Sequence, residues 1–298
     1  MPWLQLKLKS HEEYVEQIGD AISELGALSV TLMDAKDTPI LEPAPGETPL
    51  WNDVLMMFLF DADIDTKAFL KLWHSNPLAK NCRSEKFELL EDKDWEREWM
   101  DRFHPMKFGS RLWICPSWKE IPDQNAVNVM LDPGLAFGTG THPTTALCLE
   151  WLDSQDLNNK TLIDYGCGSG ILAIAALKLG AKKVYAVDID PQAILATKEN
   201  AKRNGVFDER LIVDYPAAIE DTVTEIVIAN ILAGPLVELS QKIAGHCSKN
   251  GLIALSGILK NQATITREAY LQWFKMEEPA YKEDWSRLSG TKTINKTE

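Results

Sequence analysis

Several chemistries are excluded by what this sequence of 298 residues lacks. Its five cysteines are odd in number, widely spread and never form a C-x-x-C pair, so we expect neither a disulfide framework nor a zinc site. The five histidines show no ligand spacing, and we expect no bound metal. No apolar run approaches the length of a membrane-spanning helix, and the longest, VLMMFLF at 54–60, is typical of a strand.

Basic residues are scarce as well. The sequence has 31 Lys and Arg against 44 Asp and Glu, which gives a formal net charge of −13. This opposes a protein that binds nucleic acid directly over a broad surface, because such binding needs a basic face. An acidic surface would steer a basic partner, although solubility alone explains it equally well. The start, MPWLQLKLKS, alternates like a strand and lacks the apolar core of a signal peptide, so we expect a cytoplasmic protein with no membrane partner.

The first part of the chain predicts the element order β-α-β-β-α-β. Ser10 with Glu13 three residues later is typical of a capping box, which predicts that the first helix starts at Ser10. This order is that of the ferredoxin-like split motif, and nothing in it indicates catalysis, so residues 1–91 are expected to form a binding domain. The predicted elements are strands at 3–8, 27–34, 53–61 and 86–91, with helices at 10–25 and 65–75.

A segment dense in charge and tryptophan follows, EDKDWEREWMDRFHPM. Asp94 can cap a helix of about two turns that ends before Pro105. Trp95 and Trp99 are four residues apart and share one face of such a helix, which favours packing against a neighbouring domain. We therefore expect a linker helix at 92–105.

From residue 106 onward, strands and helices alternate, which predicts a doubly wound, mainly parallel sheet over 106–298. Two strands near 111–115 and 126–131 are expected to precede the alternation, and a polar tail is expected at 290–298. The alternating elements are strands in KTLIDYG, KKVYAVDID, EIVIAN and GLIALSG, with helices from 170, 191, 234 and 262.

A glycine cluster lies in LIDYGCGSGILAIAALKLG at 162–180. Gly166, Gly168 and Gly170 separate a strand from an almost wholly apolar helix, an arrangement that lets the backbone approach a ligand at the helix N-terminus. The spacing G-x-G-x-G differs from the G-x-G-x-x-G of the dinucleotide fingerprint, since Ile171 follows Gly170. Alone, the cluster is weak evidence for any one cofactor.

A carboxylate at the end of the next strand strengthens the case for a nucleoside. Asp188 stands 22 residues after Gly166 (188 − 166), where a carboxylate can accept both hydroxyls of a ribose. Asp190 is expected to cap the helix that begins at Pro191. Together with the glycine turn, Asp188 predicts a cofactor that contains adenosine.

Asn230 ends the strand EIVIAN and is expected at the same edge of the sheet. Its surroundings are similar to the [DN]-P-P-[YF] box of amine methyltransferases, although Ile231, Leu232 and Ala233 replace the prolines and the aromatic residue. The replacement removes the ring that stacks on nucleobases, and an apolar loop suits an alkyl amine. The alternative is that Asn230 only caps the following helix.

The stretch DPGLAFGTGTHPTT at 132–145 is a second glycine-rich loop that runs into a helix. It has no lysine and no P-loop spacing, so a phosphate-binding P-loop is excluded. Pro143 suits the first helical position and places Thr144 and Thr145 in the first turn, whereas Thr141 is more easily read as a cap. His142 at this helix start is expected to be structural, as is His104.

The run D-x-G-x-G-x-G from Asp164 resembles the first motif of class I S-adenosylmethionine-dependent methyltransferases. With GTGTHPTT, DIDPQAI and NILAGPL, the chain resembles the family of bacterial methyltransferases of ribosomal protein L-eleven (L11) over nearly its whole length. The resemblance implies a Rossmann-like α/β fold with an N-terminal ferredoxin-like α+β domain for substrate recognition. It also implies transfer of methyl groups from S-adenosyl-L-methionine to lysine or N-terminal amino groups of L11.

The resemblance assigns roles to individual residues. The glycine-rich loop, with Gly134, Gly138 and Gly140, would close over the cofactor. The side-chain oxygen of Asn230 and the carbonyl of Ile231 would accept hydrogen bonds from the amine, with no dedicated general base. The cofactor-binding residues would be Thr145, Gly166, Gly168, Asp188 and Asn230.

Three other functions remain open from the sequence. A nicotinamide-dependent oxidoreductase would also use a carboxylate such as Asp188 to bind a ribose, but it typically has the glycine spacing G-x-G-x-x-G, which this chain lacks. A nucleic-acid methyltransferase is opposed by the net charge and by the missing aromatic residue. A non-catalytic ribosome-assembly protein could retain the fold, because fold alone does not fix function. Nothing in the sequence demands a dimer, and we expect a monomer.

Overall fold

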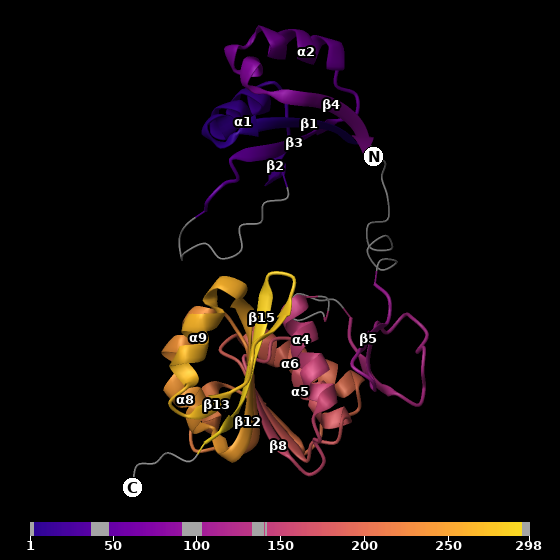
Figure 1. Ribbon diagram of the computed structural model, residues 1–298. Helices are drawn as coiled ribbons and strands as arrows, with labels where there is room; N and C mark the ends of the chain where they lie inside the picture. Colours follow the sequence, from indigo (N-terminus) through magenta and orange to yellow (C-terminus); the bar gives the residue numbers. More distant parts are fainter. Residues whose placement is uncertain (1–2, 37–47, 91–102, 133–139, 141, 294–298) are drawn as a thin grey trace. The chain divides into compact units, whose positions relative to one another are not determined.

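The computed structural model forms two compact units, Met1–Met100 and Asp101–Glu298, which are drawn in Figure 1. In the part of the chain that is described, no helix is long and apolar enough to cross a membrane. Most of the expected linker helix, with Asp94, Trp95 and Trp99, lies outside the described residues. The structure describes residues 3–36, 48–90, 103–132, 140 and 142–293.

The N-terminal unit has the expected order of elements. Its four strands form one antiparallel sheet in the order β2-β3-β1-β4. Alternate residues of β1 and β3 face one side of the sheet and pack there with apolar residues of both helices. The elements are β1 (Trp3–His11), η1 (Glu12–Tyr14), α1 (Val15–Glu24), β2 (Ser29–Asp34), β3 (Asp53–Asp61), α2 (Thr66–Ser75), η2 (Pro77–Asn81) and β4 (Arg83–Leu90).

The prediction that Ser10 caps the first helix is wrong. Ser10 lies in β1, opposite Val54 of β3, and its hydroxyl donates a hydrogen bond to the carbonyl of Asn81 at 3.0 Å. The side chain is fully buried, so strand pairing and this tertiary hydrogen bond outweigh the local capping preference. The second helix does have its local cap, because Asp65 accepts from the backbone N–H groups of Lys67 and Ala68.

The C-terminal unit contains an eight-stranded sheet with the order β10-β9-β8-β11-β12-β15-β13, and β14 pairs with β15. The first five strands are parallel to one another, β15 is antiparallel to them, and β13 and β14 are each antiparallel to β15. Chain order reverses between β8 and β11, which makes this point the switch of a doubly wound sheet. The strands are β8 (Thr161–Tyr165), β9 (Lys183–Val187), β10 (Leu211–Asp214), β11 (Thr224–Asn230), β12 (Cys247–Leu259), β13 (Phe274–Met276), β14 (Ala280–Lys282) and β15 (Trp285–Lys292).

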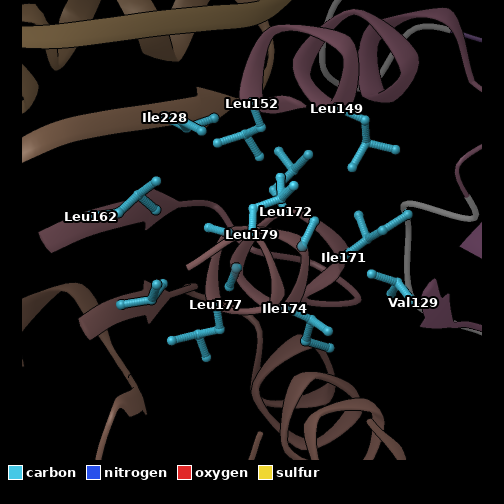
Figure 2. Packing of buried hydrophobic residues seen from close by; sticks show 14 of the residues in the cluster. Val129, Leu149, Leu152, Leu162, Ile171, Leu172, Ile174, Leu177, Leu179 and Ile228 are labelled. Carbon is cyan, nitrogen blue, oxygen red and sulfur yellow. The ribbon is translucent and has the colours of Figure 1, made fainter. Parts of the chain in front are cut away.

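Helix α5 is apolar on every side because it is enclosed by other elements. Its side chains contact Leu149 and Leu152 of α4 (Pro143–Ser154), Leu162 of β8 and Val129 of β7 (Val127–Met130) within one buried cluster (Figure 2). This packing fixes the helix whose first residue follows the glycine turn. The helices and short 3-10 turns of this unit are α4 (Pro143–Ser154), α5 (Ile171–Lys178), α6 (Pro191–Arg203), η3 (Pro216–Ile219), α7 (Ala233–Glu238), α8 (Ser240–Gly245), η4 (Lys260–Gln262) and α9 (Ala263–Tyr270).

The sequence prediction missed several strands here. Residues 290–292, expected in a polar tail, belong to β15, which lies between β12 and β13. Strand β10 was not predicted, nor were β13 and β14. The two strands expected near 111–115 and 126–131 are β6 (Leu112–Cys115) and β7 (Val127–Met130), and together with β5 (Met106–Phe108), which was not predicted, they form a separate small sheet.

Candidate active site

Three strand ends bring the predicted site residues to one edge of the large sheet. Tyr165, the last residue of β8, pairs with Val187 of β9 and Ala229 of β11. The residues that follow these three positions are Gly166, Asp188 and Asn230. Because the three strands are parallel, their carboxyl ends and these residues share the edge at the switch point, where open α/β sheets bind ligands.

The glycine turn after β8 has a backbone that only glycine adopts easily. Gly166, Gly168 and Gly170 have φ angles of 81°, 53° and 79°. The N–H groups of Gly166 and Cys167 both donate to the carbonyl of Val187, at 2.8 and 3.0 Å, which ties the turn to β9. A Cβ atom on Gly170 would lie 2.7 Å from a methyl group of Thr197, so the turn is closely packed as well as strained for other residues.

Asp188 follows β9 directly and is oriented by the glycine turn. Its Oδ2 accepts a hydrogen bond from the Gly168 N–H at 2.9 Å, and its Oδ1 accepts one from the Asp190 N–H at 3.0 Å. Each carboxylate oxygen keeps a second lone pair, so the group can still accept from two hydroxyls. The predicted cap is confirmed, because the Asp190 side chain accepts from the Gln192 N–H at 2.8 Å in front of Pro191.

The Asn230 amide is held at one end and lacks a partner at the other. Its Nδ2 donates to the Thr145 hydroxyl at 3.4 Å, whereas Oδ1 is buried without a hydrogen-bond partner among the described residues. The alternative role as a helix cap is excluded, because α7 begins after Leu232 and has no side-chain cap. A buried acceptor without a donor is costly, so the position favours a ligand that brings an N–H or O–H group.

Ile231 lies between two glycines that leave room for it. A Cβ on Gly166 would come within 2.3 Å of its Cγ2 atom, and a Cβ on Gly257 of β12 within 2.2 Å of its carbonyl oxygen. Gly257 has a φ of 85°. Sequence reasoning missed Gly257; the available signal was a glycine inside a strand, which often marks a close backbone approach.

The start of α4 supplies the support behind Asn230. Thr145 is fully buried, and its hydroxyl accepts a hydrogen bond from the Asn230 side chain. Direct contact between Thr145 and a cofactor stays a prediction. The side chain of His142 caps α4 by accepting a hydrogen bond from the Thr144 N–H, which confirms the predicted structural role. Gly140 has a φ of 83°, and Gly134, Gly138 and Thr141 lie outside the described residues.

A buried carboxylic acid lies beneath the glycine turn. Asp164 of β8 is fully buried, and its Oδ2 accepts from the Ala173 N–H at 3.0 Å while Oδ1 has no partner among the described residues. Burial raises the pKa of this carboxyl from 3.8 to about 7, against the lowering effect of the Ala173 hydrogen bond. The nearby carboxylate of Asp188 adds to the rise in pKa.

The raised pKa of Asp164 predicts a pH-dependent stability. The folded protein keeps this proton up to about pH 7 whereas the unfolded chain releases it near pH 4, so raising the pH through this window destabilises the fold. Asp164→Asn should remove this pH dependence. Between pH 5 and pH 8 the free energy of unfolding of the parent should therefore fall by about 3 kcal/mol relative to that of the variant. Urea unfolding of both proteins at several pH values measures this difference. If the free energies of unfolding of the two proteins change with pH in the same way, the prediction is wrong.

The comparisons with known proteins agree with this geometry. The family model for ribosomal protein L11 methyltransferase matches residues 2–293. Proteins of that name from Shewanella sediminis and Shewanella woodyi are each 58% identical over 290 residues, which is 97% of this chain and 99% of each relative. The chain belongs to the ribosomal protein L11 methyltransferase family.

A solved structure supports the same family. The ribosomal protein L11 methylase from Lactobacillus delbrueckii subsp. bulgaricus is 31% identical, with a TM-score of 0.59, and the match covers 64% of this chain and all of that one. As a member of the L11 methyltransferase family, the chain is a protein methyltransferase of class I fold, and its cofactor is S-adenosylmethionine. The residues at the sheet edge are compatible with that cofactor: they provide a carboxylate that can still accept hydrogen bonds, a turn of glycines without side chains, and an amide oxygen that has no partner among the described residues.

Proposed function

We propose that the chain transfers methyl groups from S-adenosylmethionine to amino groups of ribosomal protein L11, on lysine side chains or the N-terminus. The observation that supports this best is the buried Oδ1 of Asn230, which has no donor in the part of the chain that the structure describes and lies next to the glycine turn. An incoming amine would supply the missing N–H group. The proposed setting is a monomer in the cytoplasm, with residues 1–91 as the recognition domain, 92–105 as the linker and 106–298 as the methyltransferase domain.

The residues that follow strands β8 and β9 would bind the cofactor. Asp188, already oriented by Gly168, would accept hydrogen bonds from the ribose hydroxyls. Gly166 and Gly168 carry no side chain, so the cofactor can approach the backbone N–H groups in front of α5. S-adenosylmethionine, when bound, supplies an electrophilic methyl group.

The remaining work is to present a neutral amine. A free lysine has a pKa near 10.4, and removal from water disfavours its charged form, which lowers that pKa. Oδ1 of Asn230 and the carbonyl of Ile231 would accept N–H groups and so orient the nitrogen lone pair. Gly257 and Gly166 leave the space in which Ile231 takes this position. The released proton passes to solvent, so catalysis here consists of alignment and desolvation.

Asp188→Ala should weaken binding of S-adenosylmethionine. Two hydrogen bonds from ribose hydroxyls to a carboxylate are worth about 1.5–3 kcal/mol each, so a loss of at least tenfold in affinity is expected. Calorimetric titration of both proteins measures it, and unchanged affinity would remove Asp188 from the site. The matched control is Asp221→Ala, which removes an exposed carboxylate ahead of β11, at the opposite edge of the sheet.

The class of cofactor and nucleophile can be tested directly. Calorimetry with S-adenosylmethionine and then with NAD should show binding of the first alone, and binding of NAD alone would favour an oxidoreductase. Ribosomal protein L11 with all its amines acetylated should accept no methyl groups. Methylation of that blocked protein, or of ribosomal RNA, would contradict an amine methyltransferase.

A further inference from the structure

A groove of about 500 Å³ runs between α1 and β2 in the N-terminal unit. Its floor is apolar and includes Val15 of α1, Val30 and Leu32 of β2, and Met56 of β3. Val30 is 43% exposed, although it is a large apolar residue in a strand. An apolar floor that remains accessible indicates a surface that another chain can cover.

Strand β2 is at the end of its sheet, and among the described residues it pairs with β3 alone. Its outer edge therefore offers backbone N–H and C=O groups to an added strand. Val30 and Leu32 point to the same side of the sheet, since side chains alternate along a strand. An extended segment laid along β2 would place every second side chain over the floor of the groove.

The rim of the groove is acidic. Glu12, Glu13, Glu16 and Asp20 line it and are exposed. The sequence from 10 to 35 contains six carboxylates and no Lys or Arg. Such a surface attracts Lys and Arg side chains and repels the phosphates of RNA or of a membrane surface.

We propose that this groove docks an extended, basic segment of the substrate ribosomal protein. The inference rests on the proposed function, because a substrate methylated on lysines carries positive charge around its targets. Apolar side chains of the segment would cover Val30 and Leu32 above the buried Met56, and its Lys or Arg side chains would meet the carboxylate rim. Charge complementarity at the rim would raise the rate of encounter and fix the orientation of the segment.

The test reverses the charge of the rim without touching the methyltransferase unit. In the full-length double variant Glu16→Lys/Asp20→Lys, the KM for ribosomal protein L11 should rise by about tenfold, mainly through slower association. The kcat and the affinity for S-adenosylmethionine should stay unchanged. The matched control is Asp61→Lys/Asp63→Lys, which makes the same change of charge at exposed positions of the same unit outside the groove.

Circular dichroism should show that both double variants are folded. If the KM is unchanged in the groove variant, or rises equally in both pairs, the docking proposal is wrong. If the parent protein itself transfers no methyl group to ribosomal protein L11, the proposed function fails instead. A further variant, Val30→Asp, alters the floor without adding positive charge and should also raise the KM.

Discussion

Asn230→Ala is expected to lower kcat by about a hundredfold, because the amine loses an acceptor that aligns its lone pair. Among the described residues, the Asn230 Oδ1 atom is buried without a hydrogen-bond partner, so its removal relieves an unfavourable burial. The substitution also removes the 3.4 Å contact with the buried Thr145 hydroxyl, which offsets this gain, so the variant should be about as stable as the parent. A loss of activity without a loss of stability is typical of a functional residue and not of a structural one.

Steady-state kinetics with ribosomal protein L11 and a thermal unfolding curve measure both quantities. Thr145→Val provides the comparison, because it removes the hydroxyl behind the amide and keeps the amide itself. We expect a smaller fall in kcat for this variant. Equal turnover in the parent and in Asn230→Ala would contradict the role given to the amide.

Gly257→Ala is the second prediction with a large effect. The new Cβ would lie 2.2 Å from the Ile231 carbonyl oxygen, so that carbonyl has to move by about 1 Å. A displacement of this size at an aligning group should lower kcat by about a hundredfold. The φ of 85° adds strain, so some stability is lost as well.

Gly180→Ala separates misalignment from strain. Gly180 has a φ of 107°, and a Cβ there would lie 2.8 Å from the Asn158 side chain. This glycine follows α5, at the end of the helix away from the glycine turn. The control should lose stability and keep its kcat. If kcat falls equally in both variants, or if Gly257→Ala keeps full turnover, then Gly257 does not position the carbonyl.

The sequence predicted best what depends on local spacing. The glycine turn and Asp188 belong to one β-α-β unit, so their separation along the chain already implies their proximity. Asn230 was placed correctly because it ends an apolar strand of the same sheet. Its hydrogen bond to Thr145, from a segment 85 residues away, follows only from the packing of α4.

The parts that sequence missed are non-local. Strand β15 looks polar, yet it lies inside the sheet because its serines are satisfied: Ser286 donates to the Ile258 carbonyl at 3.0 Å and Ser289 to Glu277 at 2.7 Å. The approach of Gly257 to Ile231 likewise joins the ends of two parallel strands. No local pattern contains such contacts, since they arise only when the sheet has formed.

The most direct measurement is the intact mass of ribosomal protein L11 after incubation with the purified chain and S-adenosylmethionine. We expect mass increases in steps of one methylene, located by peptide mapping on lysine side chains or the N-terminal amine. The same reaction with Asn230→Ala should add almost no mass to ribosomal protein L11. An unchanged mass with the parent chain, or methyl groups found only on atoms other than amine nitrogens, would contradict the proposed function.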